Sequence, residues 1–302
     1  MRGVSVKRVV VENSFAEAFD MRATALIITA DDLKWARQAA MAMTGFATSV
    51  IGCGCEAGID RELTGAETPD GRPGVRVLLF AVSTAELQKQ VLTRVGQCVL
   101  TCVGSACFGA IAGEEKLKLG AALRYFGDGW QISKKFGGRH YWRIPVMDGE
   151  FVCEATIGMT KAAVGGGNLI IMGASPRNVL NAAEAAARRI GATRDVIMPF
   201  PGGIVRSGSK VGSKYKALVA STNDAYCPTL KGALASKLGR EIASVLEIVI
   251  DGLSPEAVGE AMRAGIAAIV GLGPERGALR ISAGNYGGKL GRHHYHLRKL
   301  LS

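Results

Sequence analysis

The chain has 302 residues, 48% of them hydrophobic and 21% charged, a composition typical of folded globular proteins that excludes disordered and collagen-like chains. Lysine and arginine outnumber aspartate and glutamate by 37 to 26, but the cations are scattered and stand apart from stacking aromatics, so we expect a small anionic ligand and no nucleic acid. No apolar run reaches the roughly 18 residues of a membrane span. Seven irregularly spaced cysteines and the lack of a leader pattern predict a cytoplasmic protein with reduced thiols.

The first half of the chain shows the order strand, helix, strand twice. The apolar, β-branched run TALIIT opens the first unit, and the helix after it ends at Gly45. The second helix has Ser83 as N-cap and Glu86 in position to close a capping box. Expected strands cover residues 24–29, 47–51, 75–82 and 98–103, with a polar, glycine-rich connection over 52–74.

The same order recurs after the middle of the chain. Helices open at Ser175-Pro176 and Ser254-Pro255, and Gly191 ends the first of them. Expected strands cover residues 168–172, 195–198, 245–250 and 278–283. The repetition indicates a duplicated split β-α-β unit, each copy with a four-stranded antiparallel sheet and two helices on one face, so the predicted fold class is α+β.

The duplication predicts two lobes, residues 1–150 and 151–302. Between the two copies, residues 104–167 alternate polar and apolar side chains with glycine turns, which predicts β-hairpins inserted into the first lobe. The second lobe carries a long insert before its third strand. A sheet with helices on one face leaves an apolar face that needs a partner lobe, ligand or subunit.

One stretch, Pro199–Thr229, concentrates polar residues and residues that set backbone conformation. Pro201, Gly202 and Gly203 could bring backbone N–H groups close to a ligand. An ordinary long loop is the alternative, but structureless loops beyond about 15 residues are usually functional or disordered. Because the stretch also contains apolar residues, which argue against disorder, we expect it to carry the site.

Glu247 is the most informative single residue. Alternation in Val245–Ile250 turns the leucine and both isoleucines toward the helices and Glu247 toward the other face, between two valines. Desolvation there would raise the carboxyl pKa toward values useful for general acid/base catalysis. A solvated carboxylate on an open sheet face is an equally weighted alternative. Arg76 stands at the corresponding place of the first copy.

Further candidates lie on either side of Ser221. Asn223, Asp224 and Tyr226 offer an amide, a carboxylate and a phenol that could hold the polar edge of a heterocycle or orient a carbonyl group, although an Asx turn explains them equally well. Lys210 and Lys214 lie in GSKVGSK, which lacks the spacing of a nucleotide-binding loop but could meet an anionic tail.

Two other features give weaker signals. The run GNYGGKLG, Gly284–Gly291, leaves a predicted strand and could approach a ligand or subunit, but a glycine-rich turn is the simpler interpretation. The spacings of cysteine and histidine do not fit a zinc site, so we expect no metal.

Seven long segments spread over nearly the whole chain carry a specific resemblance. They are EAGIDRE (Glu56–Glu62), ETPDGRPGV (Glu67–Val75), FGDGW (Phe126–Trp130), PFPGGIV (Pro199–Val205), ASTNDAYCPT (Ala220–Thr229), EIVIDGL (Glu247–Leu253) and ISAGNYGGKLG (Ile281–Gly291). Together they resemble the family of formylmethanofuran:tetrahydromethanopterin formyltransferases.

The resemblance implies two ferredoxin-like lobes and transfer of a formyl group between N5 of tetrahydromethanopterin and the amine of methanofuran or methylofuran. Glu247 matches the strand carboxylate proposed as catalytic acid/base in that family. The family has no metal or prosthetic group, so the two carriers are cosubstrates and no cofactor is tightly bound. For the oxyanion we expect the N–H groups of Gly202 and Gly203 and the side chain of Asn223 as donors.

The basic composition departs from the acidic archaeal members, which are homotetramers in methanogens. It points to the formyltransferase subunit of the formyltransferase/hydrolase complex of methylotrophs, in one-carbon metabolism from formaldehyde to formate, with partner subunits, a homo-oligomer or both. A non-catalytic pterin-binding scaffold subunit is the alternative, and the presence of Glu247 and of Asn223 to Tyr226 speaks against it. Nucleic-acid binding by the basic surface is a third hypothesis.

Overall fold

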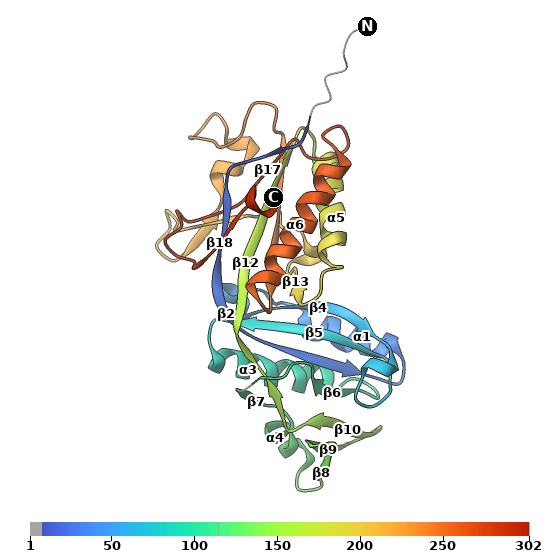
Figure 1. The fold of residues 1–302 in the computed structure, drawn as a ribbon. Helices are drawn as coiled ribbons and strands as arrows, with labels where there is room; N and C mark the ends of the chain where they lie inside the picture. Colours follow the sequence, from blue (N-terminus) through green and yellow to red (C-terminus); the bar gives the residue numbers. More distant parts are fainter. Residues whose placement is uncertain (1–7, 114, 302) are drawn as a thin grey trace. The chain divides into compact units, whose positions relative to one another are not determined.

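The computed structural model describes residues 8–113 and 115–301. Contacts within the chain divide it into two compact units. The first unit is Asp20–Ala163, and the second unit joins the segment that ends at Phe19 to the segment that begins at Val164. Helices and mainly antiparallel strands make up both units, so the predicted α+β class is confirmed (Figure 1).

The first unit is built on four antiparallel strands in the order β6-β2-β5-β4. Ser83 caps the second helix as predicted, by accepting a hydrogen bond from the N–H of Glu86 at 3.2 Å, and Gly45 ends the first. The strands are β2 (Phe15–Thr29, in this unit from Asp20), β4 (Cys55–Leu63), β5 (Gly74–Ala81) and β6 (Ala106–Gly109), and the helices are α1 (Leu33–Thr44) and α3 (Thr84–Arg94).

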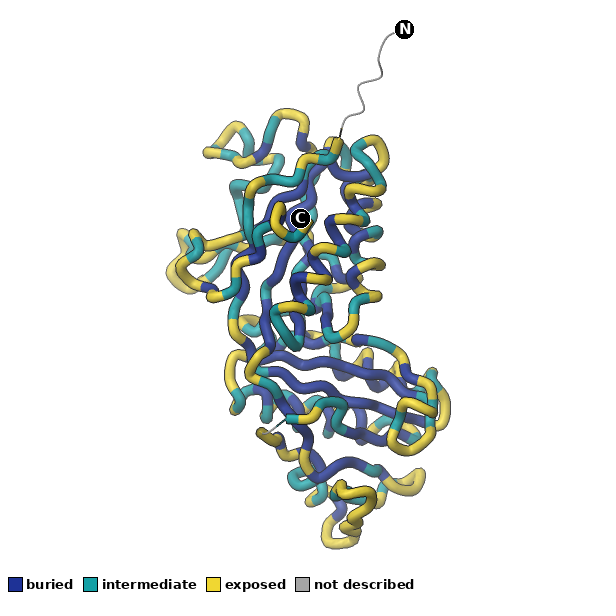
Figure 2. The backbone as a smooth tube through the Cα atoms, in the orientation of Figure 1, coloured by how far each residue is buried: buried dark blue, intermediate teal, exposed yellow. Residues whose placement is uncertain are grey.

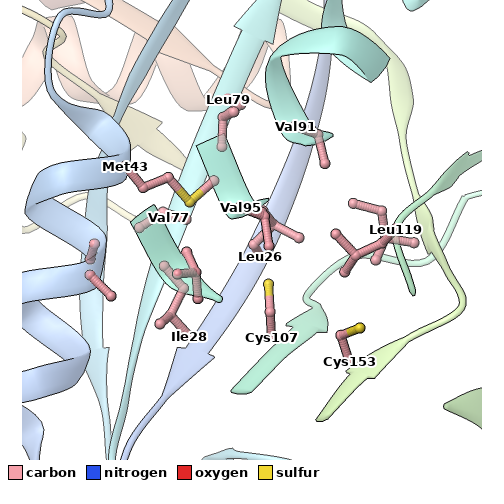
Figure 3. Close-up of a cluster of buried hydrophobic side chains, with 14 of the residues drawn as sticks. Leu26, Ile28, Met43, Val77, Leu79, Val91, Val95, Cys107, Leu119 and Cys153 are labelled. Carbon is pink, nitrogen blue, oxygen red and sulfur yellow. The ribbon is translucent and has the colours of Figure 1, made fainter. Parts of the chain in front are cut away.

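The core of the first unit lies between this sheet and its two helices. Alternate residues of the strands, among them Leu26, Ile28 and Val77, are fully buried and meet Met43 of α1 and Val91 of α3 (Figure 3). Figure 2 shows the same strands as continuous buried segments, with exposed residues concentrated in the turns. Burial of each such side chain stabilises the folded state by roughly 1.5–3 kcal/mol. This face of the sheet is therefore occupied by the packing of the helices.

Strand β4 lies within the segment predicted to be a connection over 52–74, and that prediction is wrong. Cys55 and Ala57 are buried and Glu56 between them is half-buried, as in a strand, but the pairing with β5 shifts between Ile59 and Arg61. Such a bulge breaks the period of two, so the alternation is lost in the sequence.

Two predicted strands of the first unit are also wrong. Over 47–51 only β3 (Thr48–Ser49) is extended, and the short helix α2 (Val50–Cys53) follows. Over 98–103 the chain continues α3 through a π-helical turn, Val95–Val99, with both valines buried. A short β-branched run cannot be assigned to strand or helix from periodicity alone.

The inserted hairpins of the first unit are confirmed. Phe136 pairs with Arg139 across the first turn, and Val146 pairs with Gly149 across the second. The strands are β8 (Ile132–Phe136), β9 (Arg139–Val146) and β10 (Gly149–Glu154), with β7 (Lys116–Lys118) paired to β11 (Thr156–Gly158), and α4 (Gly120–Leu123) between them.

The second unit has the antiparallel order β17-β12-β16-β13, so the four main strands of each unit, numbered along the chain, are arranged 4-1-3-2. Ser175 and Ser254 cap the two helices as predicted, and Figure 1 shows these helices side by side. The strands are β12 (Thr160–Gly173, in this unit from Val164), β13 (Val196–Ile197), β16 (Ser244–Gly252) and β17 (Arg280–Ser282), with β1 (Val10–Val11) and β18 (His293–His296) at the edges, and the helices are α5 (Pro176–Ile190) and α6 (Pro255–Leu272).

Residues 199–243, called the insert, connect β13 to β16. The insert contains the hairpin of β14 (Ser209–Val211) and β15 (Ala220–Thr222). Its residues Leu238 and Ile242 pack against Ile170 and Met172 of β12. The apolar face expected to need a partner is therefore covered in part by the chain itself, on the side opposite to α5 and α6.

Candidate active site

Strand β16 presents Glu247 on the sheet face that the insert covers. Ile248 and Ile250 pack into the core beside the helices, whereas Val245 joins the cluster formed with the insert. The predicted alternation of this strand is confirmed. Glu247 lies directly opposite Ile170 of β12, which belongs to the same cluster.

The Glu247 side chain lines a pocket of about 50 Å³ beside the insert. A single water needs at least about 10–15 Å³ of such space, whereas sites for drug-sized ligands run from about 300 Å³ upward. The pocket therefore suits a small reacting group and not a whole heterocyclic carrier. Its other walls are Ile170, Val205, Arg206, Ser207, Gly208, Thr222, Asn223, Tyr226, Cys227, Val245 and Leu246.

The electrostatic state of Glu247 follows from this setting. Desolvation by burial raises the pKa of its carboxyl group from 4.5 to about 7. Near neutral pH the acid and the carboxylate are then both populated, as an acid/base shuttle requires. This geometry supports the interpretation of Glu247 as a desolvated acid, and not as a solvated carboxylate on an open face.

The backbone of the insert is tied to the strand at Glu247 itself. The N–H of Val205 donates to the carbonyl of Glu247 at 2.7 Å, and the N–H of Glu247 donates to the carbonyl of Val205 at 2.9 Å. Three residues later, Gly208 comes so near that a Cβ atom there would lie 3.2 Å from Glu247 Oε2. The pocket wall thus passes directly over the carboxyl group.

Two of the polar candidates in the insert reach this pocket. Asn223 and Tyr226 both line it. Burial raises the pKa of the Tyr226 phenol, the charge of Glu247 adds to the rise, and a hydrogen bond with Ser282 opposes it. The sequence motif therefore brings an amide and a phenol to the same small space as the carboxyl group.

Asp224 has a different environment from its two neighbours. It forms an ion pair with Lys210 across the β14–β15 hairpin, and this pair lowers the carboxyl pKa. Each charge is compensated by the other, so neither is an open binding charge. Lys214 lies exposed in the turn of the same hairpin, without an ion-pair partner among the described residues.

The proline-glycine bend lies outside the Glu247 pocket, and its expected role as oxyanion donor is corrected. Pro201, Gly202 and Gly203 are not among the walls of this pocket, and Gly202 lines a separate open depression beside Met198. The N–H of Gly203 donates to the carbonyl of Phe200 at 2.8 Å, so it is already bound within the turn. Both glycines have φ near +60° to +75°, which explains the glycine pair by conformation.

Sequence reasoning missed several walls of the pocket. Arg206, Ser207, Gly208 and Thr222 lie in the stretch expected to carry the site, and Gly208 and Thr222 in two of its motifs, but none of them was predicted as a site residue. The signal that could have found them is position: they lie within a few residues of Val205 and Asn223, the two points where the insert meets Glu247 and its pocket.

The first unit has a different residue at the place that Glu247 occupies. Arg76 of β5 pairs with Ile27 just as Glu247 pairs with Ile170. The Arg76 guanidinium forms an ion pair with Asp60 at 2.5 Å, with both side chains nearly buried. No ion pair among the described residues compensates the charge of Glu247, so the two equivalent places differ in their electrostatics.

In the described part of the chain, residues 8–113 and 115–301, no group of three His, Cys, Asp or Glu side chains is placed to hold a metal ion. None of its helices is both long enough and apolar enough to span a membrane.

Comparison with known proteins gives consistent matches along the chain. Residues 4–146 match the family model described as formylmethanofuran-tetrahydromethanopterin formyltransferase, and residues 149–300 match the model of the proximal lobe of that enzyme. A formylmethanofuran–tetrahydromethanopterin formyltransferase of Methylococcus capsulatus is 63% identical over 292 residues, covering 97% of this chain and 98% of the relative.

Two solved structures are similar throughout. The formyltransferase/hydrolase complex of Methylorubrum extorquens with methylofuran contains a chain with a TM-score of 0.95 and 57% identity, covering 97% of this chain and 96% of that one. The formyltransferase of Methanosarcina barkeri gives a TM-score of 0.91 and 44% identity, covering 97% of this chain and 98% of that one. The chain is therefore an enzyme of the formylmethanofuran-tetrahydromethanopterin formyltransferase family.

Proposed function

We propose that this protein moves a formyl group between N5 of tetrahydromethanopterin and the amine of methanofuran or methylofuran. The observation that carries the proposal is Glu247, a desolvated carboxyl group with a pKa of about 7 in a pocket sized for a small reacting group. Membership of the family supports the choice of the two carriers.

Glu247 moves one proton in this reaction. The amine of the acceptor attacks the formyl carbon, a C–N bond forms, and the carbonyl oxygen becomes an oxyanion. The Glu247 carboxylate takes the proton that the attacking nitrogen loses and gives it to the departing nitrogen as the second C–N bond breaks. General acid/base catalysis of this kind contributes about 100- to 10,000-fold.

We assign the stabilisation of the oxyanion to the side-chain amide of Asn223. It lines the same pocket as Glu247, whereas Gly202 and Gly203 do not. A donor in such a position is worth on the order of 3 kcal/mol in the transition state. The Arg206 side chain, also at the pocket, adds positive charge on the side of the developing anion.

The rings and tails of the two carriers lie outside the pocket, against the insert. Tyr226 holds the polar edge of a ring. Lys214 meets an anionic tail, because its charge is exposed and unpaired among the described residues. Lys210 and Asp224 act as a pair that keeps the hairpin in shape.

We further propose that the two lobes, residues 1–150 and 151–302, are duplicated ferredoxin-like units. The common strand order 4-1-3-2 and the equivalent pairing of Arg76 and Glu247 support this interpretation. We propose that the chain works as the formyltransferase subunit of a complex with hydrolase subunits, because a close relative by structure stands in such a complex. The cytoplasmic location and the lack of a tightly bound cofactor stay predictions.

The test is a formyl-exchange assay with the purified chain, tetrahydromethanopterin and an N-formyl furfurylamine carrier, run alone and with hydrolase subunits. We expect exchange by the wild-type chain and its loss in Glu247→Gln. Pterin binding without exchange under both conditions would support a scaffold subunit and overturn the proposal.

A further inference from the structure

A second buried carboxylate lies in the same unit as Glu247. Glu17 of β2 is 1% exposed and accepts hydrogen bonds from four backbone N–H groups. Oε2 accepts from Tyr286 at 2.6 Å and Gly288 at 2.8 Å, and Oε1 accepts from Leu290 at 2.6 Å and Gly291 at 2.7 Å. Burial by itself would raise the pKa of Glu17, but the four donors outweigh it and lower the pKa from 4.5 to about 2.

The backbone of Gly284–Gly291, called the 284–291 loop, is shaped around this carboxylate. At Gly291 a Cβ atom would lie 3.0 Å from Glu17 Cγ and would collide with the carbonyl of Ala18, so only glycine fits there. The loop is also held where it begins. The side-chain amide of Asn168 accepts from the N–H of Gly284 at 2.6 Å and donates to its carbonyl at 3.2 Å.

The 284–291 loop leaves the sheet next to the Glu247 row. Ile170 pairs with Glu247 on one side and with Ser282 on the other, so these three side chains share a row on one face. Asn168 and Gly284 are the next residues of β12 and of the chain after β17 on that same face. The loop therefore begins within one step of the row that contains the acid.

Tyr286 is the side chain that the loop brings toward the acid. Burial raises the pKa of its phenol, and the negative charges of Glu247 and Glu17 raise it further. The residue is 39% exposed, and its ring lies 5.9 Å from the ring of Phe19, centre to centre. An exposed aromatic face beside the acid can stack on the ring of a carrier.

We infer that Glu17 is a positioning residue for the reaction proposed above: its carboxylate holds the 284–291 loop so that Tyr286, which does not line the small pocket itself, forms an outer wall of the site against a carrier ring. The inference rests on the proposed function of Glu247. A carboxylate is needed because it offers acceptor positions to all four donors, whereas the amide of glutamine has one acceptor oxygen and turns two N–H donors toward the N–H groups of the loop.

A double-mutant cycle tests this coupling. We expect Glu17→Gln and Tyr286→Ala each to lower kcat/KM for formyl transfer by about 10-fold or more, since misplacement of a site wall by about 1 Å can cost about 100-fold. The double variant should be no slower than the slower single variant, because both changes remove the same wall. The inference would be overturned if the loss of kcat/KM in the double variant equalled the product of the two single losses. Wild-type kcat/KM in either single variant would also overturn it.

The matched control is Glu67→Gln. Glu67 also accepts a backbone N–H, from Thr64 at 3.0 Å, and its pKa is also lowered to about 2, but it lies in a turn of the first unit. We expect this variant to keep kcat/KM within about 2-fold of the wild type, since surface changes of this kind have small effects.

Amide hydrogen exchange measures the loop without substrate and without any variant. In the wild-type protein, the amides of Tyr286, Gly288, Leu290 and Gly291 should exchange more slowly than that of Lys289. Equal and fast exchange of all five would overturn the inference even if Glu17→Gln failed to fold. Slow exchange of these amides without formyl transfer by the wild-type protein would contradict the proposed function. It would still show that Glu17 holds the 284–291 loop.

Discussion

Val205 and Glu247 exchange two backbone hydrogen bonds, at 2.7 Å and 2.9 Å, and this pair joins the insert to the strand at the acid. The distance between the carboxyl group and the pocket wall is therefore set by main-chain contacts. A substitution of the Glu247 side chain should leave the backbone around the pocket in place. Its effect on activity therefore reflects the loss of the carboxyl group and not a change of pocket structure.

Glu247→Gln should lower turnover by at least about 100-fold, the size of a lost general acid/base group, while carrier binding stays within a few-fold. In the wild type, kcat/KM should rise with pH through about 7, because the carboxylate form takes the proton from the attacking amine. The measurement is a pH–rate profile of both proteins. A wild-type profile that is flat between pH 5.5 and 8.5 contradicts this role.

The raised pKa of Glu247 also predicts how stability depends on pH. The folded protein keeps this proton up to about pH 7, whereas the unfolded chain loses it near 4.5, so ionisation at Glu247 destabilises the fold as pH rises across that window. Glu247→Gln removes this contribution. The melting temperature of the variant, minus that of the wild type, should increase from pH 5 to pH 8. A difference that stays constant over this range would contradict the raised pKa of Glu247.

Gly208→Ala should narrow the pocket. The new Cβ atom would lie 3.2 Å from Glu247 Oε2 and 3.6 Å from Asn223 Cβ, so we expect turnover to fall by roughly 10-fold with the melting temperature nearly unchanged. Gly232→Ala, also in the insert, has open space around it and serves as the control. Equal activity of the two variants would show that the wall above Glu247 tolerates a methyl group.

Lys214→Ala should weaken binding of an anionic carrier. An exposed charge contributes about 0.2–1 kcal/mol to binding, so KM should rise by roughly 1.4- to 5-fold. The difference should disappear near 0.5 M salt, where screening shortens the range of the interaction. Lys89→Ala in α3, a surface lysine of the first unit, is the control and should leave KM unchanged at every salt concentration.

Arg76→Ala should destabilise the protein without a direct effect on chemistry. Breaking this nearly buried pair removes the guanidinium that contacts Asp60 at 2.5 Å, and we expect it to lower the free energy of unfolding by up to about 3–5 kcal/mol. Arg37→Ala breaks an ion pair with Glu62 whose side chains are 50% and 46% exposed, and should lower the free energy of unfolding far less, because solvent screens this pair. Urea denaturation of both variants makes the comparison, and similar losses would contradict it.

Local patterns in the sequence predict most of the second unit. The alternation in β16 orients Glu247, and the Ser-Pro pairs mark the first turns of α5 and α6, because in each case the decisive partners lie within a few residues. The polar motif of the insert likewise indicates Asn223 and Tyr226, and both reach the pocket.

Features that depend on distant contacts could not be predicted. The bulge in β4 shifts its alternation at Ile59, and the helical turn after α3 has the residue types of a strand. Glu17 looks like any polar residue near an N-terminus, because its four donors come from residues about 270 positions later. The glycines at 202 and 203 look like an anion site by composition, but their N–H groups lie outside the pocket, which only the fold reveals.

The small volume beside Glu247 limits which acyl groups the enzyme can transfer. At Gly208 an added Cβ atom would lie 3.2 Å from Glu247 Oε2, so we expect the backbone of the insert to favour a formyl group over a bulkier acyl group beside the carboxyl group. Selectivity for one-carbon units would then come from main-chain contacts, which single side-chain substitutions cannot easily relax.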